Sequence, residues 1–250
     1  MDSVNNIVRR FLPRTVRPYR IISGPLRGTK IVTSFYEYPA AILGYTEKAV
    51  LDFFSSTVQK GQTWLDIGAH YGYTSLFLCR LVGGEGHVFA FEPALSTAGY
   101  LNSTKKINHL SQLTILPMAL SDKDNMEILE LPFTRGMVDS TFESKVEMER
   151  LISIKLDWLW PQICTPIHKI DGIKIDVQGM EVCVLAGMQQ ILLRDRPVLV
   201  IEIHKNVSRS ELATVLKNAG YQNKGISLDT GAVLAPEVFQ DNHSYVFYSR

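Results

Sequence analysis

The stretch from Thr63 to Pro93 restricts the fold of this chain more than any other part of the sequence. It reads TWLDIGAHYGYTSLFLCRLVGGEGHVFAFEP, which predicts a buried strand, a glycine turn, a helix over 73–82 and a second strand over 87–91. The second strand ends at Glu92, twenty residues after Gly72. This order is typical of a doubly wound α/β fold that binds a nucleotide at the turn and the ribose at the acid.

The glycines of the turn indicate which nucleotide it binds. A dinucleotide site uses three glycines, whereas this turn reads D-x-G-x-x-x-G with Gly68 and Gly72 alone. Asp66 at the mouth of the turn would repel a pyrophosphate, but it suits a ligand that carries an ammonium and a sulfonium. The turn therefore favours S-adenosylmethionine as the cofactor. An ordinary strand-to-helix turn in another doubly wound protein is the alternative.

The length and composition fit one large domain with an N-terminal extension. The 250 residues are 46 % hydrophobic, enough for a substantial core. We expect a basic arm and hairpin flap over 1–45 and the cofactor-binding domain over 46–250. No apolar run approaches the roughly 18–20 residues of a membrane span, and the N-terminus lacks the core of a signal peptide, so we expect a cytoplasmic protein. The three cysteines are scattered without ligand spacing, and neither a disulfide framework nor a metal is predicted.

The first thirty residues carry an uneven share of the charge. They hold seven basic side chains against Asp2, although the whole chain has a net charge of only +1. Such an arm is either a solvated terminal segment or a contact for an anionic partner, such as a phosphate-bearing substrate or a membrane surface. No nucleic-acid motif accompanies it, so we expect no nucleic-acid partner. The sequence gives no indication of the oligomeric state.

Strands and helices alternate along the rest of the chain. The most distinctive predicted elements are a hairpin around GPLRG, an insertion whose tip we expect to face the substrate, and a helix with a capping box at Ser208 and Glu211. The predicted elements are a hairpin over 21–32, helices over 46–60, 95–107, 182–192 and 208–220, strands over 113–116, 168–176 and 197–204, a closing strand SYVFYS, and the insertion over 123–156 with strand-like pieces at 126–131 and 151–156 around GMVDSTFESK.

Polar side chains follow two of the predicted central strands. Asp176, with Gln178 and Glu181, ends one strand, and Glu202 and His204 end the next. Because the carboxyl ends of parallel strands meet at one edge of a sheet, we expect both groups to lie on the same rim as the glycine turn. Capping of the following helix is the alternative role for the acids.

Methyl transfer to a hydroxyl requires a group that accepts the hydroxyl proton. His204 and Asp176 are the candidate general bases, and histidine is the better matched in pKa. A third strand leads into residues 119–122, where the adenine ring is expected, with a plain surface loop as the alternative. His70 lies at the cofactor turn, where a local hydrogen bond is the alternative role for its side chain.

Taken in order, these motifs resemble the FkbM family of S-adenosylmethionine-dependent methyltransferases. The matching pieces are GYTE at 44–47, WLDIGAHYGYTS at 64–75, FEP at 91–93, ALSD at 119–122, KLD at 155–157, KIDVQGMEVCVLAG at 174–187 and PVLVIEIH at 197–204. The resemblance implies a Rossmann-like class I methyltransferase fold, with a seven-stranded, mostly parallel sheet, an antiparallel last strand and helices on both faces. It also implies O-methylation of a hydroxyl on a sugar, glycan or secondary metabolite.

The resemblance also assigns residues to the two sides of the site. The catalytic candidates are His204, Asp176 and Glu202. The cofactor-binding candidates are Glu47, Asp66, Gly68, His70, Gly72, Glu92, Pro93, Ala119, Leu120, Ser121, Asp122 and Asp176.

Two positions depart from the family. His70 stands where Asn is usual, which changes the hydrogen bonding beside the cofactor. Gln178 stands where Glu is usual, which removes a carboxylate near the acceptor and any metal or cation binding that rests on it. A methyltransferase-like domain that binds cofactor or a partner without turnover is one alternative. A nicotinamide oxidoreductase is another, disfavoured by the missing third glycine and by Asp66.

Overall fold

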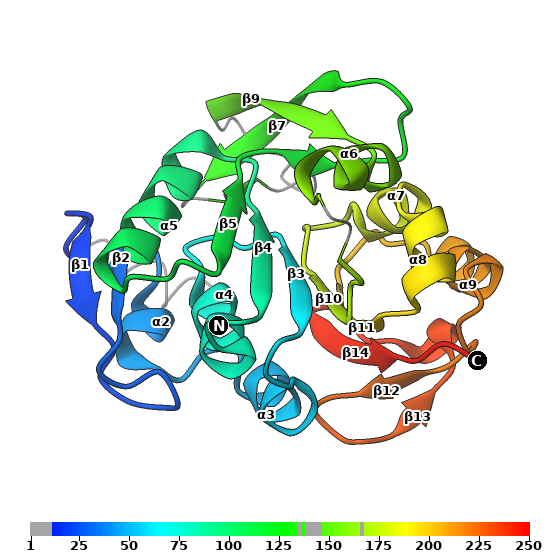
Figure 1. Ribbon diagram of the computed structural model, residues 1–250, viewed down its shortest axis with the longest axis horizontal. Coiled ribbons are helices and arrows are strands. Elements are labelled where there is room, and N and C mark those ends of the chain that lie inside the picture. The colour runs from blue at the N-terminus through cyan, green and yellow to red at the C-terminus, as the bar shows by residue number, and fades with distance from the viewer. Residues whose placement is uncertain (1–11, 135–136, 139–146, 166–167) are drawn as a thin grey trace.

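Eight strands form the central sheet of this computed structural model, which describes residues 12–134, 137–138, 147–165 and 168–250 (Figure 1). A second, smaller sheet and a two-stranded hairpin lie outside it. In spatial order the strands of the central sheet are β13 (Val233–Leu234), β12 (Gly225–Ser227), β14 (His243–Phe247), β11 (Val198–Ile203), β10 (Gly172–Ile175), β3 (Thr63–Ile67), β4 (His87–Phe91) and β5 (Leu113–Leu116).

The strand directions confirm the predicted Rossmann-like architecture. β11, β10, β3, β4 and β5 are parallel, and β14 is inserted antiparallel between β11 and β12. The closing strand is therefore antiparallel, as predicted. The short β13 pairs with β12 and adds an eighth strand at the edge of the seven that were predicted.

Helices cover both faces of the sheet, and each face has its own core. Leu65 and Ile67 of β3 point into one core, whereas Trp64 points into the other. This alternation makes β3 apolar on both sides, as expected of a parallel strand between two helical layers. The first face is covered by α6 (Leu156–Ile163), α7 (Glu181–Ala186), α8 (Gln189–Asp195) and α9 (Arg209–Asn218), and the second by α2 (Pro39–Leu43), α3 (Lys48–Thr57), α4 (Tyr73–Val82) and α5 (Leu95–Ile107).

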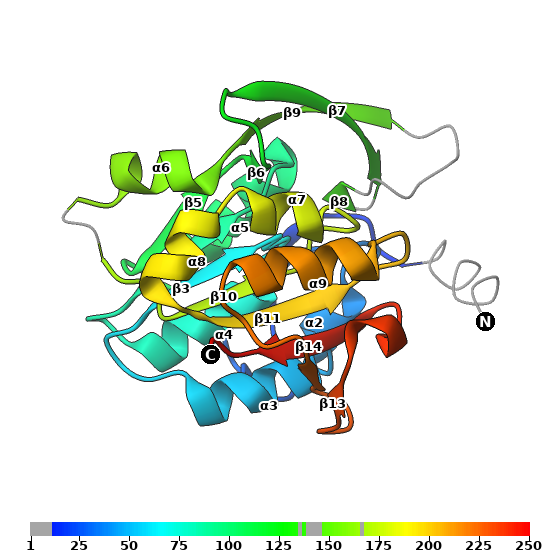
Figure 2. The same ribbon diagram turned by 90° about the vertical axis from the view of Figure 1, so that its right-hand side faces the viewer.

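The insertion forms the second sheet, which stands above the main body in Figure 2. β7 (Glu127–Thr134) and β9 (Glu147–Ile154) pair antiparallel, which confirms the predicted hairpin. β6 (Ala119–Leu120) joins β9, so the first half of the expected adenine-side loop is a short strand. β8 (Met137–Val138) pairs with β7. The rest of the GMVDSTFESK stretch lies outside the described residues, so the position of this tip stays a prediction.

An N-terminal hairpin is also present, but its first strand precedes the range of 21–32 that was predicted for it. β1 (Arg17–Arg20) pairs antiparallel with β2 (Lys30–Thr33). The amide of Val32 donates a hydrogen bond to Thr104 Oγ1 of α5 at 2.9 Å, so the hairpin is attached to that helix. Residues 1–11 of the basic arm lie outside the described residues.

Several expected elements differ in extent. The helices expected over 46–60 and 208–220 are the shorter α3 and α9. The helical run over 182–192 is divided into α7 and α8 at Gly187, the C-cap residue of α7, where a Cβ would lie 1.8 Å from the Ser121 carbonyl oxygen. The strand expected over 168–176 is limited to β10. The short α2 and α6 were not predicted. No helix in the described part of the chain is long and apolar enough to cross a membrane.

Candidate active site

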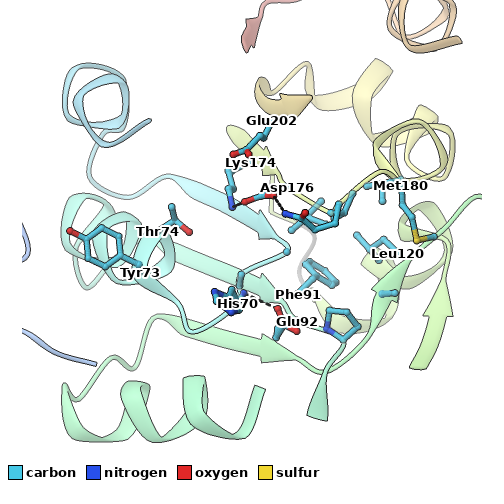
Figure 3. A pocket seen from close by; sticks show the side chains of 18 of the residues that line it. His70, Tyr73, Thr74, Phe91, Glu92, Leu120, Lys174, Asp176, Met180 and Glu202 are labelled. Carbon is cyan, nitrogen blue, oxygen red and sulfur yellow. Dashed lines mark hydrogen bonds and ion pairs between the residues drawn. The ribbon is translucent and has the colours of Figure 1, made fainter. Parts of the chain in front are cut away.

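A cavity of about 300 Å³ opens at the carboxyl ends of β3, β4, β10 and β11 (Figure 3). This is the edge at which open α/β sheets bind their ligands. Leu131 and Leu151 of the insertion hairpin cover it from one side. The other residues that line it are Glu37, Tyr38, Thr46, Glu47, Ile67, Gly68, Ala69, His70, Tyr73, Thr74, Phe91, Glu92, Pro93, Met118, Ala119, Leu120, Lys174, Asp176, Val177, Gln178, Met180, Val184 and Glu202.

The glycine turn forms the wall between β3 and α4. Gly68 has a left-handed φ of +82°, and a Cβ at this position would lie 1.8 Å from the carbonyl oxygen of Asp176. Only glycine therefore allows the turn to pack against the end of β10. Gly72 has a φ of +85° and packs against Leu101 of α5, so it shapes the turn and does not line the cavity.

Asp66 lies behind the turn and not on the cavity wall. Its side chain is fully buried, and its Oδ2 accepts hydrogen bonds from Thr74 Oγ1 at 2.7 Å and Ser75 Oγ at 2.5 Å. Its Oδ1 is 3.7 Å from Lys174 Nζ. The sequence predicted that this carboxylate contacts a cationic ligand. In the structure it instead holds the first turn of α4 through these two hydrogen bonds.

Glu92 ends β4 and faces the cavity. It accepts hydrogen bonds from the amides of His70 at 2.8 Å and Ala94 at 3.0 Å. Burial raises the pKa of Glu92 to about 8, although these two amide hydrogen bonds act in the opposite direction. Pro93 lines the cavity next to it. The binding of a ribose by this carboxylate stays a prediction, and His70 contributes its backbone amide to holding the side chain.

The expected adenine-side segment divides into two pairs of residues. Ala119 and Leu120 line the cavity, whereas Ser121 and Asp122 do not. The Ser121 amide donates to the Ile154 carbonyl at 3.0 Å, and the Ser121 carbonyl lies against α7 at Gly187. Only the first pair is therefore in a position to contact a bound ring.

Glu47 enters the cavity from the start of α3. It is the N-cap residue of this helix and has a left-handed φ of +57°, a conformation that costs energy in a non-glycine residue. Burial raises its pKa to about 7, partly opposed by the positive charge of Lys174. The segment that precedes α3 thus brings an acid whose charge changes near neutral pH to the cavity.

Lys174, Asp176 and Glu202 stand together on the opposite side of the cavity from His70 and Glu92 (Figure 3). Lys174 is only 4 % exposed, and its ammonium is 3.0 Å from Asp176 Oδ2. Burial by itself would raise the pKa of Asp176, but Lys174 and His204 outweigh it and hold this pKa below its ordinary value. Burial similarly opposes the charge of Lys174, yet Asp176, Asp66 and Glu47 raise its pKa.

His204 lies behind these carboxylates and does not line the cavity. Its Nδ1 is 2.7 Å from Glu181 Oε1, and its Nε2 is 3.5 Å from Asp176 Oδ1 and 3.4 Å from Glu202 Oε1. Burial lowers the pKa of the ring, but the three acids outweigh burial and raise it to about 10. A protonated ring is a poor proton acceptor, so this geometry favours a cavity-lining carboxylate over His204 as the general base.

Lys174 is the main residue of this cluster to which we assigned no role from the sequence. The sequence did contain an indication of its importance, because a lysine stands inside the apolar strand GIKI, two residues before an acid. A buried ammonium requires carboxylate partners, and one of them, Asp66, is 108 positions away along the chain. Tyr38 and Tyr73, which also line the cavity, carried no comparable signal.

Comparison with known proteins places this arrangement among methyltransferases. The family model described as the methyltransferase FkbM domain matches residues 66–222. No curated protein matches the chain.

Solved structures share the fold at low sequence identity. A methyltransferase FkbM from Methylobacillus flagellatus aligns with a TM-score of 0.51 and 16 % identity, over 85 % of this chain and 53 % of that one. The chain thus spans about half the length of that structure. Aeropyrum pernix fibrillarin, solved with natively bound S-adenosyl-L-methionine, aligns with a TM-score of 0.52 and 13 % identity, over 93 % and 82 % of the two chains. A putative rRNA-methylase from Clostridium thermocellum gives 0.50 and 11 %, over 80 % and 92 %.

Proposed function

The chain belongs to the FkbM family of methyltransferases, and on that premise we propose that it methylates a hydroxyl group of a sugar, glycan or secondary metabolite. S-adenosylmethionine is the cofactor. The observation that carries the proposal is the division of one cavity into two sides. The cofactor half consists of the part of the glycine turn at 68–70 with Glu92 and Pro93, and the acceptor half consists of Lys174, Asp176 and Glu202.

The residues of the cofactor half fit an adenosyl ligand. Glu92 offers a carboxylate held by two backbone amides, which suits the paired hydroxyls of a ribose. Because Gly68 has no side chain, only backbone forms the cavity wall at this residue. Ala119 and Leu120 offer an apolar surface for a ring. When bound, S-adenosylmethionine supplies an electrophilic methyl group on a sulfonium.

The acceptor half would align and deprotonate the hydroxyl. Glu202 lines the cavity, and we assign it the role of proton acceptor. Asp176 is held by Lys174 and by Gln178 Nε2, which donates to it at 3.2 Å, so it would orient the acceptor. His204 fixes both carboxylates from behind. The apolar cover of Leu131 and Leu151 would keep water from the reacting atoms.

Binding experiments test the cofactor half first. We expect calorimetry to show S-adenosylmethionine and its demethylated product S-adenosylhomocysteine binding one per chain, and NAD not binding. NAD binding without the sulfonium ligand would overturn the proposal. Asp176→Asn should keep most of the affinity for S-adenosylhomocysteine while it lowers methyl transfer to a panel of sugar and polyol acceptors.

One observation favours a second candidate, a cofactor- or partner-binding domain without turnover. Gln178 replaces the usual acid beside Asp176, so this half of the cavity has one carboxylate fewer than is usual in the family. Methyl transfer to any acceptor would exclude this candidate. Retained cofactor binding with no transfer to any hydroxyl would support it.

We also infer that the protein works in the cytoplasm, without a nucleic-acid partner. Cys79 and Cys183 are free thiols, and Cys79 is buried. Free thiols are usual where the redox environment is reducing. Contact of the basic N-terminal arm with a membrane surface stays a prediction, and residues 1–11 of the arm lie outside the described residues.

A further inference from the structure

Three potential metal ligands meet at the acceptor end of the cavity, although the sequence predicted no metal. Asp176 follows β10, Glu202 lies within β11, and His204 follows β11. One ligand atom from each lies within 4.8 Å of the other two. We propose that Asp176 Oδ1, Glu202 Oε1 and His204 Nε2 bind one divalent cation, which takes the place of the proton that Nε2 carries in the free protein. The use of this cation in catalysis rests on the proposed function, but its binding does not.

The distances within this cluster suit a metal ion better than direct hydrogen bonds. His204 Nε2 is 3.5 Å from Asp176 Oδ1 and 3.4 Å from Glu202 Oε1. Charge-assisted hydrogen bonds are typically about 2.7–2.9 Å long. By contrast, ligand atoms that lie about 2.0–2.2 Å from one ion, at angles from square to tetrahedral, are about 3.0–3.5 Å apart. An ion could therefore contact His204 Nε2 and each neighbouring oxygen at ordinary bond lengths. One oxygen of Asp176 and one of Glu202 lie within 4.8 Å of each other, so rotation of these carboxylates would bring both onto the same ion.

Glu181 supports the histidine from behind. Its Oε1 is 2.7 Å from His204 Nδ1, and the Glu181 side chain is fully buried. A carboxylate on one ring nitrogen commonly orients the other nitrogen toward a metal. The second oxygen, Glu181 Oε2, is also buried and has no hydrogen-bond partner within the described part of the chain. A buried carboxylate with an unsatisfied oxygen favours additional positive charge close by.

Lys174 supplies part of this charge but leaves the ligand atoms accessible. It contacts Asp176 through Oδ2, at 3.0 Å, whereas Oδ1 is the oxygen that faces His204. Once His204 Nε2 has given up its proton, the single charge of Lys174 stands against the carboxylates of Asp176, Glu181 and Glu202. Asp66, whose Oδ1 is 3.7 Å from the ammonium, shares this charge. Asp176 and Glu202 line the cavity and His204 does not, so an ion held here would have its remaining positions directed into the cavity.

The donor set indicates which cation to use as a probe. Two carboxylates and one imidazole combine the oxygen ligands preferred by Mg²⁺ and Mn²⁺ with a nitrogen ligand that softer ions prefer. We therefore choose Mn²⁺, which accepts both and is visible by electron paramagnetic resonance. In catalysis the ion would bind the acceptor oxygen and lower its pKa. The O–H proton would pass to the Glu202 oxygen that does not hold the ion, while the oxygen forms its bond to the methyl group and the S–CH₃ bond breaks.

The test is a titration of the full chain, freed of metal with a chelator, with Mn²⁺ alone. We expect one Mn²⁺ per chain and a nitrogen coupling from one imidazole in the spin-echo spectrum. Glu181→Gln should weaken binding about 10- to 100-fold, and Glu202→Gln should weaken it at least as much. Glu85→Gln, an exposed acid before β4, should leave binding unchanged. Thermal melts of all variants report whether they are folded.

A parallel titration with S-adenosylhomocysteine separates the two proposals. If this ligand binds but Mn²⁺ does not saturate, or if Glu202→Gln and Glu85→Gln bind Mn²⁺ equally, the cation site is excluded and the cluster is an ion-paired imidazolium. If Mn²⁺ binds with the imidazole coupling but S-adenosylhomocysteine does not, the cation site stands and the proposed function fails.

Discussion

The two halves of the cavity are built in different ways. In the cofactor half, the main elements lie within thirty-one consecutive residues. The backbone forms most of this half, through a left-handed glycine turn and two backbone amides that donate to Glu92. In the acceptor half, the side-chain charges of Asp66, Lys174 and Asp176 stabilise one another, and His204 lies beside both Asp176 and Glu202. The first half is therefore sensitive to the volume and conformation of its residues, and the second to the charge of its side chains.

The largest expected effect comes from the point where the halves meet, at Gly68. In Gly68→Ala the new Cβ would collide with the Asp176 carbonyl at a φ that alanine disfavours. We expect unfolding free energy to fall by about 1–3 kcal/mol and cofactor affinity to fall by about 100-fold. Chemical denaturation and calorimetry measure both. Gly84→Ala, with no atom within 4 Å of its Cβ, is the matched control and should change neither by much.

The next largest effect is expected at Glu202, where a substitution should impair the acceptor half and leave the cofactor half unchanged. Glu202→Gln keeps the shape of the side chain but removes its charge and basicity, so methyl transfer should fall about 100-fold. The affinity for S-adenosylhomocysteine should stay within threefold, because Glu202 lies across the cavity from Glu92. Steady-state kinetics and calorimetry on the same preparation make the comparison. Near-normal turnover would remove Glu202 from the role of base.

A smaller effect is expected from pH in the cofactor half. The pKa of Glu92 is raised to about 8 in the free protein, and ribose hydroxyls that donate to its carboxylate would favour the ionised form. A proton must then leave on binding, so affinity for S-adenosylhomocysteine should rise as pH increases through 8. We expect about 20-fold weaker binding at pH 6.5 than at pH 8.5.

Glu92→Gln provides the control for this pH dependence. It should bind more weakly at every pH and lose most of the dependence. Calorimetry in two buffers of different ionisation enthalpy reports the released proton directly. Equal affinity of the unmodified protein at both pH values would contradict a role for Glu92 at the ribose.

The smallest effect concerns the residue beside the cofactor that departs from the family. His70→Asn should change cofactor affinity less than threefold, because the backbone amide of this residue, which the substitution retains, holds Glu92. Asparagine also tolerates the left-handed φ of +51° observed here. A tenfold loss of affinity would show that the imidazole itself contacts the ligand.

Sequence reasoning described the cofactor half more fully than the acceptor half for a physical reason. Local spacing determines where a strand, a glycine turn and a helix begin, and the predicted limits of α4, β4, α5 and β5 are confirmed. It does not report which way a buried side chain points. Asp66 therefore supports α4 instead of lining the cavity, and Ser121 and Asp122 lie outside it.

In the acceptor half the decisive properties depend on contacts between distant segments. The ordinary pKa of histidine favoured His204 as the base, but three acids brought around its ring raise that pKa to about 10. Lys174 has its role only because β3 and β10 are neighbours. Gly187 likewise packs against the carbonyl of Ser121, which is far away in the sequence.

O-methylation is tested most directly by methyl transfer itself, followed by mass spectrometry with S-adenosylmethionine that carries a deuterated methyl group. We expect a hydroxyl-bearing acceptor to gain one labelled methyl on oxygen for each S-adenosylhomocysteine formed, and Glu202→Gln to lose this transfer while it still binds S-adenosylhomocysteine. Cofactor binding with no transfer to oxygen on any sugar, glycan or secondary-metabolite acceptor, or a label found on nitrogen or carbon, would contradict O-methylation.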